Sequence, residues 1–554
     1  MGETIAVGDG VVAELEALGV DTIFGIISIH NIPIYDALAR NPAFRVVKPR
    51  GESGAVNMAD AYARVSGRLG VAITSTGTGA GNAAGALIEA DAAGTPLLHI
   101  TGQVASEFLD SGRGYIHECR DQLSMLRSVS KNAYRVRRPE QAAAILRKAA
   151  LEALESPMGP VSVEIPIDFQ SRLVDVPTIV TSKTASLPPT PSELTDVVSV
   201  ISKSRRPLMW AGTGVVHADA VSEFRELAEL IDAAVLTSHG GRGVVSEHDS
   251  RCIGYFATHA DVRELLETSD LLLSVGVRFR GNETAYWDLQ VPANHIGIDI
   301  DLAAVNRNYP HAVAINGDAK QVLGALAGMI REDRPALRPD FRQEVARVRD
   351  AARRSMRESL GPYEGILDAI RETFPGDGIV VRDVTIPTTT WASRMIEVAN
   401  PRQTVHPATI GIGQALPMAI GAEIGRPGAR ILMMCGDGGF LVNLGELATA
   451  REEGLLFTTV LFDDGGYGVL RNLQNAVFDG RKVGVDLKSP DFCELARSFG
   501  FQSVRVGDAA RFRDALSEAI ESDRQWIIIV DVVELGPTPR PFSGTPSLDL
   551  YRPK

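Results

Sequence analysis

Short, uninterrupted apolar runs recur along the first third of the chain, and most are followed by a turn and a segment of helical composition. Runs of this kind are typical of strands that are buried on both faces of a parallel sheet. They lie at 22–27, 45–48, 69–74, 96–102 and 161–166, with helices expected at 34–39 and 54–65. Strands that alternate with helices in this way predict a doubly wound α/β domain.

The same alternation returns twice further along the chain. Strands are expected at 207–211, 234–237, 271–275 and 295–299, and again at 378–381, 431–434, 458–462 and 526–532. Two stretches without an apolar period, 176–193 and 331–340, contain proline with polar or charged residues and are interpreted as linkers. We therefore predict three doubly wound α/β domains with central parallel sheets, over residues 1–175, 190–332 and 355–554.

The composition is that of a soluble globular protein. With 554 residues the chain is too long for a single core. Its net charge of −13 argues against nucleic acid or an anionic membrane as a partner, and it contains no run of about 20 apolar residues that would span a membrane. The N-terminus lacks the basic and apolar regions of a signal peptide, and the four cysteines are scattered, so we expect a cytoplasmic protein with reduced thiols.

Two aspartates stand in glycine-rich turns after successive predicted strands. Asp437 follows one strand and Asp464 the next, and a helix at 443–453, capped by Asn443, is expected between them. The carboxyl ends of parallel strands form the sheet edge at which ligands bind. Two carboxylates amid glycine-rich backbone suit a Mg²⁺ ion that also holds a diphosphate. Asp and Gly are also common in ordinary strand-end turns, so the spacing alone leaves both interpretations open.

The aspartate turns belong to a set of three motifs. These are 50–55 (Arg-Gly-Glu-Ser-Gly-Ala), 406–417 (His-Pro-Ala-Thr-Ile-Gly-Ile-Gly-Gln-Ala-Leu-Pro), and 436–438 (Gly-Asp-Gly) with 463–468 (Asp-Asp-Gly-Gly-Tyr-Gly). Together they resemble thiamine diphosphate-dependent enzymes of the acetolactate synthase superfamily, and the resemblance covers nearly the whole chain. It implies thiamine diphosphate and Mg²⁺ as cofactors, with Asp437, Asp464 and the Gly466 carbonyl as metal ligands. Further cofactor-binding residues implied by the resemblance are Gly436, Gly438, Gly439 and Tyr467.

Glu52 follows the second predicted strand. In the superfamily a glutamate here faces N1′ of the aminopyrimidine ring and activates the cofactor by proton exchange, which requires a dry and rigidly held carboxyl group. Taken alone, a glutamate at this place would be interpreted as a surface residue. Many relatives have His directly before this Glu, whereas this chain has Gly51, so no relay through that His is expected.

The resemblance also assigns the third motif and the arrangement of the site. Ile412 aligns with the apolar residue that holds the cofactor in a bent shape, and the Gly411 carbonyl would accept a hydrogen bond from its amino group; a core isoleucine in a glycine-rich turn is the alternative. The first domain would bind the pyrimidine and the last the diphosphate, with Glu52 and Asp437 of one site on different subunits. At least a homodimer is therefore implied, and a homotetramer is expected.

The middle domain carries only weak signals for a nucleotide. Synthases of this superfamily bind FAD at an Arg-Phe-Asp-Asp-Arg stretch, of which the chain keeps Arg278-Phe279. Oxalyl-CoA decarboxylases bind ADP in the equivalent domain, and Asp121-Gln122 is similar to part of their sequence. A lone Gly212-Thr213-Gly214 after a strand is a weak signal. FAD or ADP therefore stays open, although the sequence argues against it.

The residues expected around the substrate differ from those of well-known specificities. Pyruvate decarboxylases have a glutamate where this chain has Leu470, and two adjacent histidines near Ile116-His117; synthases have a Pro-Gly-Gly turn near His30. Each histidine has an equally good structural interpretation. The candidates are His30 and His117 as catalytic groups, Ile29, Asn31 and Leu470 as pocket residues, and His406 as a further histidine.

These features predict a thiamine diphosphate- and Mg²⁺-dependent lyase or carboligase that acts on a 2-oxo acid and resembles acetolactate synthase. The lack of an acid beside Leu470 favours ligation over release of an aldehyde. Alternatives are a non-ligating 2-oxo acid decarboxylase and a 2-hydroxyacyl-CoA lyase or oxalyl-CoA decarboxylase-like enzyme. A non-enzymatic nucleotide-binding scaffold is disfavoured because Glu52, Asp437 and Asp464 are all present.

Overall fold

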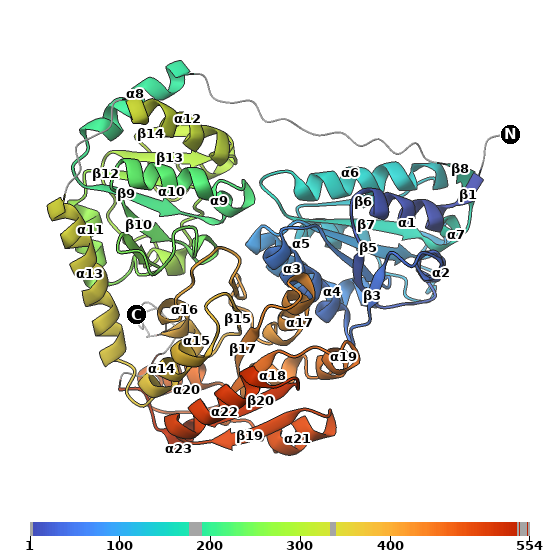
Figure 1. Ribbon diagram of the computed structural model, residues 1–554. Helices are drawn as coiled ribbons and strands as arrows, with labels where there is room; N and C mark the ends of the chain where they lie inside the picture. The colour runs from blue at the N-terminus through green and yellow to red at the C-terminus, as the bar shows by residue number, and fades with distance from the viewer. Residues whose placement is uncertain (1–3, 177–190, 333–338, 540–541, 543–550, 552–554) are drawn as a thin grey trace.

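Three parallel β-sheets, each flanked by helices, follow one another along the chain (Figure 1). The computed structural model describes residues 4–176, 191–332, 339–539, 542 and 551. Each of the three sheets has six strands, and every pairing within them is parallel. The predicted fold class of three doubly wound α/β domains is thus confirmed. Among the described helices, none combines the length and the apolar character needed to cross a membrane.

The N-terminal sheet has the strand order β3-β2-β4-β5-β7-β6. Its strands are β2 (Thr22–Gly25), β3 (Arg45–Val47), β4 (Gly70–Thr74), β5 (Leu97–Gln103), β6 (Asn132–Arg135) and β7 (Pro160–Pro166). Its helices are α1 (Val7–Ala17), α2 (Ile32–Arg40), α3 (Glu52–Ser66), α4 (Thr78–Ala93), α5 (Gln122–Val129), α6 (Ala142–Leu154) and α7 (Ile167–Gln170). A short antiparallel pair, β1 (Thr4–Ala6) with β8 (Leu173–Asp175), joins the start of this domain to its end.

The middle sheet has the strand order β11-β10-β9-β12-β13-β14. Its strands are β9 (Pro207–Ala211), β10 (Ala234–Thr237), β11 (Cys252–Gly254), β12 (Leu271–Val275), β13 (His295–Asp299) and β14 (Val313–Asn316). Its helices are α8 (Pro191–Lys203), α9 (Thr213–His217), α10 (Val221–Leu230), α11 (Ala260–Thr268) and α12 (Ala319–Glu332). The long helix α13 (Pro339–Glu358) then leads down to the last domain, as Figure 1 shows.

The C-terminal sheet has the strand order β16-β15-β17-β18-β20-β19. Its strands are β15 (Ile379–Arg382), β16 (Thr404–Val405), β17 (Ile431–Gly436), β18 (Thr458–Asp463), β19 (Gln502–Val506) and β20 (Trp526–Asp531). Its helices are α14 (Tyr363–Thr373), α15 (Ile386–Thr389), α16 (Ala392–Met395), α17 (Ala415–Gly425), α18 (Asp437–Val442), α19 (Glu446–Glu452), α20 (Gly468–Val477), α21 (Phe492–Ser498), α22 (Ala509–Glu521) and α23 (Val532–Leu535).

The two outer sheets have the same topology. Counted along the chain within each sheet, both have the strand order 2-1-3-4-6-5, whereas the middle sheet has 3-2-1-4-5-6. In the outer sheets the direction of winding reverses between β2 and β4 and between β15 and β17. Ligands of doubly wound sheets bind beyond the carboxyl ends of the strands at such a reversal. Each outer domain therefore offers one binding edge.

The outer domains pack on each other through α3 and α17. Gly421 of α17 faces the backbone of α3, where a Cβ atom would lie 2.0 Å from the carbonyl oxygen of Met58. One turn further on, a Cβ on Gly425 would lie 3.0 Å from the carbonyl oxygen of Tyr62. Glycine at these two positions lets the helices approach closely and fixes how the two binding edges are placed in one chain.

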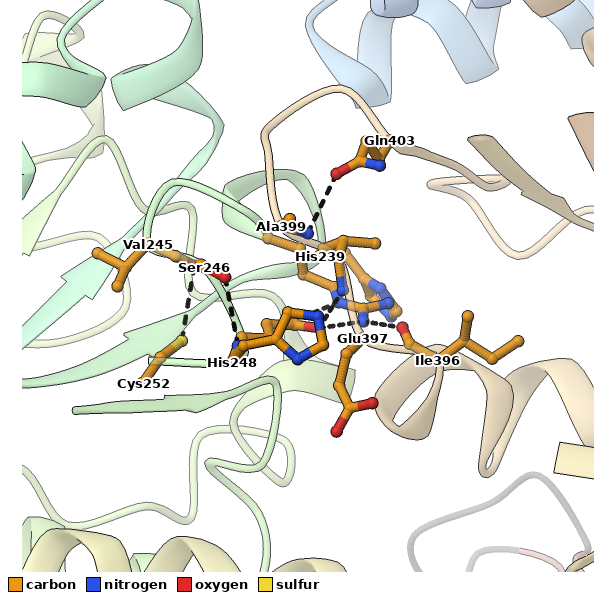
Figure 2. A network of polar contacts seen from close by, with 12 residues as sticks. His239, Val245, Ser246, His248, Cys252, Ile396, Glu397, Ala399 and Gln403 are labelled. Atoms are coloured by element: carbon orange, nitrogen blue, oxygen red, sulfur yellow. Dashed lines mark hydrogen bonds and ion pairs between the residues drawn. The ribbon is translucent and has the colours of Figure 1, made fainter. Parts of the chain in front are cut away.

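A buried polar network joins the middle and C-terminal domains (Figure 2). Arg242 forms two hydrogen bonds with Glu247, of 2.7 and 2.6 Å, and donates a third to the carbonyl of Ile396 at 2.6 Å. The Glu247 carboxylate also accepts the N–H of Val398 at 3.0 Å. Figure 2 shows His239 beside this network. The two domains are thereby fixed to each other, so the space between them is formed by the fold itself.

The expected helix at 443–453 is wrong in its start and its cap. α19 begins at Glu446, and the additional helix α18 begins at Asp437 itself. Asn443 is the C-terminal cap residue of α18 and not the N-terminal cap of α19, which is Gly445, and its side-chain amide donates to the Gly413 carbonyl at 2.6 Å. A tertiary contact has replaced the local capping interaction.

The two expected linkers are shorter than predicted at their ends. Helix α8 already begins at Pro191, helix α12 continues to Glu332, and helix α13 begins at Pro339. The rest of both linkers, 177–190 and 333–338, lies outside the described residues.

The contact between α3 and α17 gives a stability test. Gly421→Ala should destabilise the protein by about 1–3 kcal/mol, because the added methyl group meets backbone that has no room to move. Gly328→Ala is the matched control, since Gly328 is also helical, in α12, and no atom lies within 4 Å of its added Cβ. The control should be neutral or stabilise by about 0.5–1 kcal/mol. Thermal unfolding of both variants measures the difference, and equal melting temperatures would contradict the packing described.

Candidate active site

Asp437 and Asp464 follow neighbouring strands of the C-terminal sheet. Gly436, the last residue of β17, pairs with Phe462 of β18, so the turns that follow start side by side. Asp437 is 1% exposed and begins α18. Ser489 donates its hydroxyl to Asp437 Oδ2 at 3.2 Å. The neighbouring Asp463 is instead paired with Arg505 at 2.7 Å, which leaves Asp464 as the second carboxylate of the turn pair.

The two carboxylates perturb each other. Burial and the nearby charge of Asp464 raise the pKa of Asp437 to about 6. Burial also raises the pKa of Asp464, although Arg471, 3.8 Å away, opposes the shift. Asp464 Oδ1 is buried and has no hydrogen-bond partner among the described residues. A buried oxygen without a partner, next to a second buried carboxylate, is what a bound cation would satisfy.

Glycines shape the backbone around this pair. A Cβ on Gly438 would lie 2.6 Å from the ring of Tyr467, and one on Gly468 would lie 2.0 Å from Asp464 Oδ2. Gly466 has φ +149°, and a Cβ there would lie 2.0 Å from the Val485 carbonyl oxygen. Because Gly438 and Gly468 have no side chain, the side chains of Tyr467 and Asp464 can lie directly against the backbone at these two positions.

A third buried carboxylate, Asp383, holds the loop that contains Gly411 and Ile412. It follows β15, and its oxygens accept the N–H groups of Gly413 at 2.9 and 3.0 Å and of Ala415 at 3.3 Å. Burial raises its pKa to about 6. A Cβ on Gly439 would lie 3.3 Å from the Asp383 carboxyl group, so Asp383 also lies against the Asp437 turn.

The other end of this loop is held from the N-terminal domain. Glu89 of α4 accepts the N–H of Thr409 at 2.9 Å and its hydroxyl at 2.6 Å. Arg64 of α3 donates to the His406 carbonyl at 2.7 Å and forms an ion pair with Glu89 at 2.9 Å. With both ends fixed, the loop presents Ile412, which is 40% exposed, at the rim of the site.

Glu52 is the first residue of α3, at the carboxyl edge of the N-terminal sheet. Asn82 donates to Glu52 Oε2 at 3.1 Å, and a Cβ on Gly79 would lie 2.9 Å from Oε1. Within the chain, the turn before Glu52 is held by Glu446, whose carboxylate accepts the N–H groups of Arg50 and Gly51 at 3.0 and 3.1 Å. The position of Glu52 therefore depends on both outer domains.

The two candidate histidines lie together at the same edge. The rings of His30 and His117 have centroids 5.1 Å apart, and His117 Nδ1 is 3.3 Å from the hydroxyl of Ser75. Burial and the neighbouring His117 lower the pKa of His30, whose Nδ1 is buried without a partner among the described residues. The two imidazole rings therefore lie close enough to act on the same group at this edge.

Asn31 is used within its own loop. Its side chain accepts the N–H of Ser28 at 2.7 Å and donates to the carbonyls of Ile26 and Thr74 at 3.0 and 3.2 Å. All of these partners are backbone, so Asn31 shapes the loop, while Ile29 beside it is exposed.

Large apolar side chains are exposed along both binding edges. On the N-terminal domain these are Ile27, Ile29 and Ile116; on the C-terminal domain they are Ile410, Ile412, Val442 and Leu470. Exposed apolar groups gathered around a polar site are typical of interaction surfaces or ligand-binding grooves.

The residues present fit a metal-bound diphosphate. The available ligands are hard oxygen atoms, and Asp464 Oδ1 has no partner among the described residues. The glycines beside Tyr467 leave the backbone free of side chains, so that a diphosphate could approach it. Burial and the charge of Asp464 raise the pKa of Asp437, an unfavourable arrangement that a divalent cation would offset.

Comparison with known families agrees with this geometry. Residues 5–125, 194–326 and 387–530 match the N-terminal, central and C-terminal domains of the thiamine pyrophosphate enzymes, the first and last of which are described as TPP-binding domains. The chain belongs to the thiamine pyrophosphate enzyme family, in the group of decarboxylases and carboligases.

Individual relatives cover nearly the whole chain. A probable 2-ketoarginine decarboxylase of Pseudomonas aeruginosa is 33% identical over 90% of this chain and 89% of its own length. The acetolactate synthase isozyme 2 large subunit of Escherichia coli is 30% identical over 95% of both chains. The fold is similar to a thiamine diphosphate-dependent 4-hydroxybenzoylformate decarboxylase of Rhodococcus jostii, with a TM-score of 0.80, 22% identity and coverage of 95% and 99% of the two chains.

The middle-domain glycines have a packing explanation. A Cβ on Gly212 would lie 1.8 Å from the Gly276 carbonyl oxygen, and Gly214 donates its N–H to that same oxygen at 3.2 Å. The turns after β9 and β12 thus touch through backbone, which requires glycine with or without a nucleotide. Gln122 is likewise accounted for, since its side-chain oxygen accepts the Gly77 N–H at 2.6 Å.

Sequence reasoning missed Asp383 and Glu446 as positioning residues. Asp383 directly follows a predicted strand, in the same way as Asp437, and that placement was an available signal. Glu446 reaches across to residues 50 and 51, and nothing in the sequence indicates this contact.

The raised pKa of Asp437 gives a pH test of the metal site. Protonation near pH 6 removes a ligand, so the affinity for Mg²⁺ in the presence of thiamine diphosphate should be full above pH 7. Below pH 6 it should fall by about tenfold per pH unit for each proton displaced. Calorimetric titration between pH 5 and 8 measures this dependence. Asp437→Asn should weaken binding strongly and remove the dependence, whereas Asp479→Asn, at an exposed position of the same domain, should change neither. A pH-independent affinity in the unmodified protein would refute the assignment.

Proposed function

We propose that the protein is a thiamine diphosphate- and Mg²⁺-dependent lyase or carboligase that cleaves the C–C bond beside the carbonyl of a 2-oxo acid and joins the acyl unit to a second carbonyl compound. The observation that carries the proposal is the pair Asp437 and Asp464 at the winding reversal of a family domain that binds this cofactor. Asp437 is buried and has its pKa raised by burial and by the charge of Asp464, and Asp464 Oδ1 is buried without a partner among the described residues. Thiamine diphosphate supplies the carbon nucleophile and the electron sink for the cleaved bond when it is bound.

The residues of the chain would divide the work as follows. Asp437, Asp464 and the Gly466 carbonyl would hold Mg²⁺, and the glycines 436, 438 and 439 with Tyr467 would enclose the diphosphate. Glu52 would hold a proton on its carboxyl group, oriented by the N–H of Asn82. Gly411 and Ile412 would set the shape of the bound cofactor, supported by Asp383.

Ligation is favoured by the apolar first turn of α20. Val469 and Leu470 stand there, and this turn carries no acidic residue of its own. Neither side chain can donate a proton to the bound acyl unit, which would prolong the time in which a second carbonyl compound can react. An apolar wall of this kind supports carboligation.

A non-ligating decarboxylase is the second candidate, and a specific observation favours it. The adjacent rings of His30 and His117 could deliver the proton that releases an aldehyde. The 33% identical relative is itself named a decarboxylase. The two candidates differ in product and not in the cofactor chemistry.

The proposal includes a homodimer as the smallest working unit and a homotetramer as the expected assembly. Each binding edge leaves apolar side chains exposed, among them Ile29 and Ile116 on one edge and Ile412 and Leu470 on the other. A second copy that brings one edge against the other would bury these groups and complete the site.

Product analysis tests the proposed reaction. Purified protein with thiamine diphosphate and Mg²⁺ is incubated with a panel of 2-oxo acids, including pyruvate and 2-ketoarginine, and release of CO₂ and the organic product are measured. We expect CO₂ release with formation of an acyloin or a 2-hydroxy-2-acyl acid. Free aldehyde as the sole organic product would contradict ligation and support the decarboxylase alternative.

Glu52→Gln is the accompanying variant. It should keep cofactor affinity within a few-fold and lose turnover by about 100-fold or more, because the amide no longer exchanges the proton. Glu267→Gln, at an exposed position on α11, is the control and should keep full turnover. Full activity of Glu52→Gln would show that the proton is handled elsewhere.

Complementation tests the shared site. Glu52→Gln and Asp437→Asn chains are co-expressed with two different tags, and the mixed dimer is isolated. If each site takes Glu52 from one chain and Asp437 from the other, one of its two sites is intact, and activity should be about half that of the unmodified dimer. Both homodimers should be inactive. An inactive mixed dimer would place the whole site within one chain.

A further inference from the structure

A cavity of about 690 Å³ lies between the middle and C-terminal domains. Three of its lining residues, Asp383, Ile410 and Val469, stand next to the groups that form the candidate cofactor site. The cavity is therefore continuous with the place where the substrate would react. Its volume is within the range of small-molecule pockets and far exceeds the need of a three-carbon acid.

Arg382 is a buried arginine on the wall of this cavity that forms no ion pair with a carboxylate of the described residues. It is 3% exposed, donates from Nη1 to the Thr388 carbonyl at 2.8 Å, and lies 3.4 Å from His239 Nδ1 through Nη2. Its Nε is buried without a partner, and within the described part of the chain no carboxylate forms an ion pair with it. A buried, uncompensated charge is costly unless a ligand neutralises it.

Arg242 provides the internal comparison. It is buried to the same extent as Arg382, belongs to the same interface, and has Glu247 as a bidentate partner. The fold is thus able to supply a carboxylate to a buried arginine here and does not supply one to Arg382.

Two further arginines line the cavity without an acidic partner among the described residues. Arg394 donates to the carbonyls of Thr389 and Thr390 at 3.2 and 2.9 Å, and its guanidinium lies 4.9 Å from the centre of the Tyr255 ring. Arg280 donates to the Ala92 and Ala408 carbonyls. Backbone carbonyls fix both side chains but do not neutralise them.

The acids near the cavity are already in use. Asp383 accepts backbone N–H groups, as described above, and Glu283 accepts the N–H of His239 at 2.9 Å. Burial raises the pKa of both carboxyl groups. The remaining polar lining is rich in donors, including His406, whose two ring nitrogens are buried without partners among the described residues. The lining is therefore complementary to an anion.

The anion should be a group on the part of the substrate that remains after CO₂ is released. A 2-oxo acid gives up its C1 carboxylate as CO₂, and a strong cation held against that group would stabilise the starting state and slow the reaction. Arginines placed for productive binding serve a group at the far end of the molecule. A cationic far end, such as the guanidinium of 2-ketoarginine, would be repelled.

We propose that this cavity binds the distal carboxylate of a 2-oxo dicarboxylic acid, with Arg382 as its principal partner and Arg394 and Arg280 beside it. The proposal rests on the proposed action on 2-oxo acids and names the substrate class of that site. Arg382 is then a specificity-determining residue, and it makes a charge-assisted contact that a monoacid of the same length lacks.

A matched substrate series tests the proposal. The holoenzyme is assayed with 2-oxoadipate, with 2-oxohexanoate, which lacks only the distal carboxylate, and with a cationic 2-oxo acid of similar length. We expect kcat/KM for 2-oxoadipate to exceed that for 2-oxohexanoate by about tenfold or more, and the cationic acid to be the poorest substrate. Equal values for the diacid and the monoacid would overturn the proposal.

Variants assign the preference to Arg382. Arg382→Met should lower kcat/KM for the diacid by about 10- to 100-fold, mainly through KM, and change the monoacid by less than about threefold. Arg382→Lys should restore part of the loss. Arg430→Met is the control, because Arg430 precedes β17 at the opposite edge of the same sheet and donates only to the Ser522 carbonyl among its described contacts. An equal loss for both acids would refute a role in distal recognition.

Inhibition by a diacid that is not itself turned over provides a second test. Glutarate has no 2-oxo group and should inhibit competitively, with weaker inhibition in Arg394→Met, a variant to use if Arg382→Met does not fold by thermal melting. Absence of inhibition by glutarate in the unmodified holoenzyme would also overturn the proposal. Failure of the proposed function looks different: the cofactor binds, yet no 2-oxo acid of any charge is turned over.

Discussion

Two like charges held together in a buried place are the constraint on which the candidate site depends. Asp437 and Asp464 follow adjacent parallel strands, so the register of β17 and β18 fixes their separation before any ligand is considered. Without a ligand the pair is unfavourable, because burial and the charge of Asp464 raise the pKa of Asp437. Asp437 is buried and Asp464 is partly buried, and a divalent cation bound there, as proposed above, would offset the repulsion.

The two outer domains share one topology but contribute different groups to the candidate site. The shared strand order places a winding reversal in each, and the residues gathered there differ in kind: a carboxyl group and two histidines on one, paired carboxylates on the other. Contacts between the domains then set the geometry of each half. Glu446 holds the turn before Glu52, and Glu89 holds the loop before Ile412, so each domain orders a loop of the other. The precision of the site is thus a property of the domain interface.

The buried strands were predictable from the sequence, and most edge strands were not. Strands such as β4, β5, β17 and β18 are apolar on both faces and stand out as runs. In the three six-stranded sheets the missed strands are β6, β11, β14, β16 and β19, each at an edge of its sheet, and the short pair β1 and β8 was missed as well. Edge strands have one neighbour and less burial, and β14, for example, alternates between partly buried and exposed residues. Their pairing is decided by tertiary contacts that local sequence does not contain.

The same distinction holds for the site. Glu52, Asp437 and Asp464 could be found because each stands in a glycine-rich turn after a strand, within motifs that resemble a known family. Asp383 has the same placement but no motif, and its role depends on the N–H groups of a loop 30 residues away. The arginine-lined cavity was not predictable, because its walls come from two domains. The inference drawn from it also depends on the lack of an ion pair at Arg382 among the described residues, which a sequence does not reveal.

A buried arginine without an ion pair destabilises the fold, so selection would be expected to replace it unless it has another role. An apolar residue of similar volume at position 382 would avoid the desolvation cost, and replacement of buried charges by apolar groups is often neutral or stabilising. Arg382 would then persist for its effect on binding. The alternative is that it stabilises the fold through Thr388 and His239, but two hydrogen bonds to neutral groups do not offset the burial of a full charge, which is also reflected in the lowering of its pKa to about 9. Arg242, with Glu247 opposite, shows what a structural arginine looks like in this interface. The difference between the two sites is one carboxylate, and a substrate that carries this group would supply it.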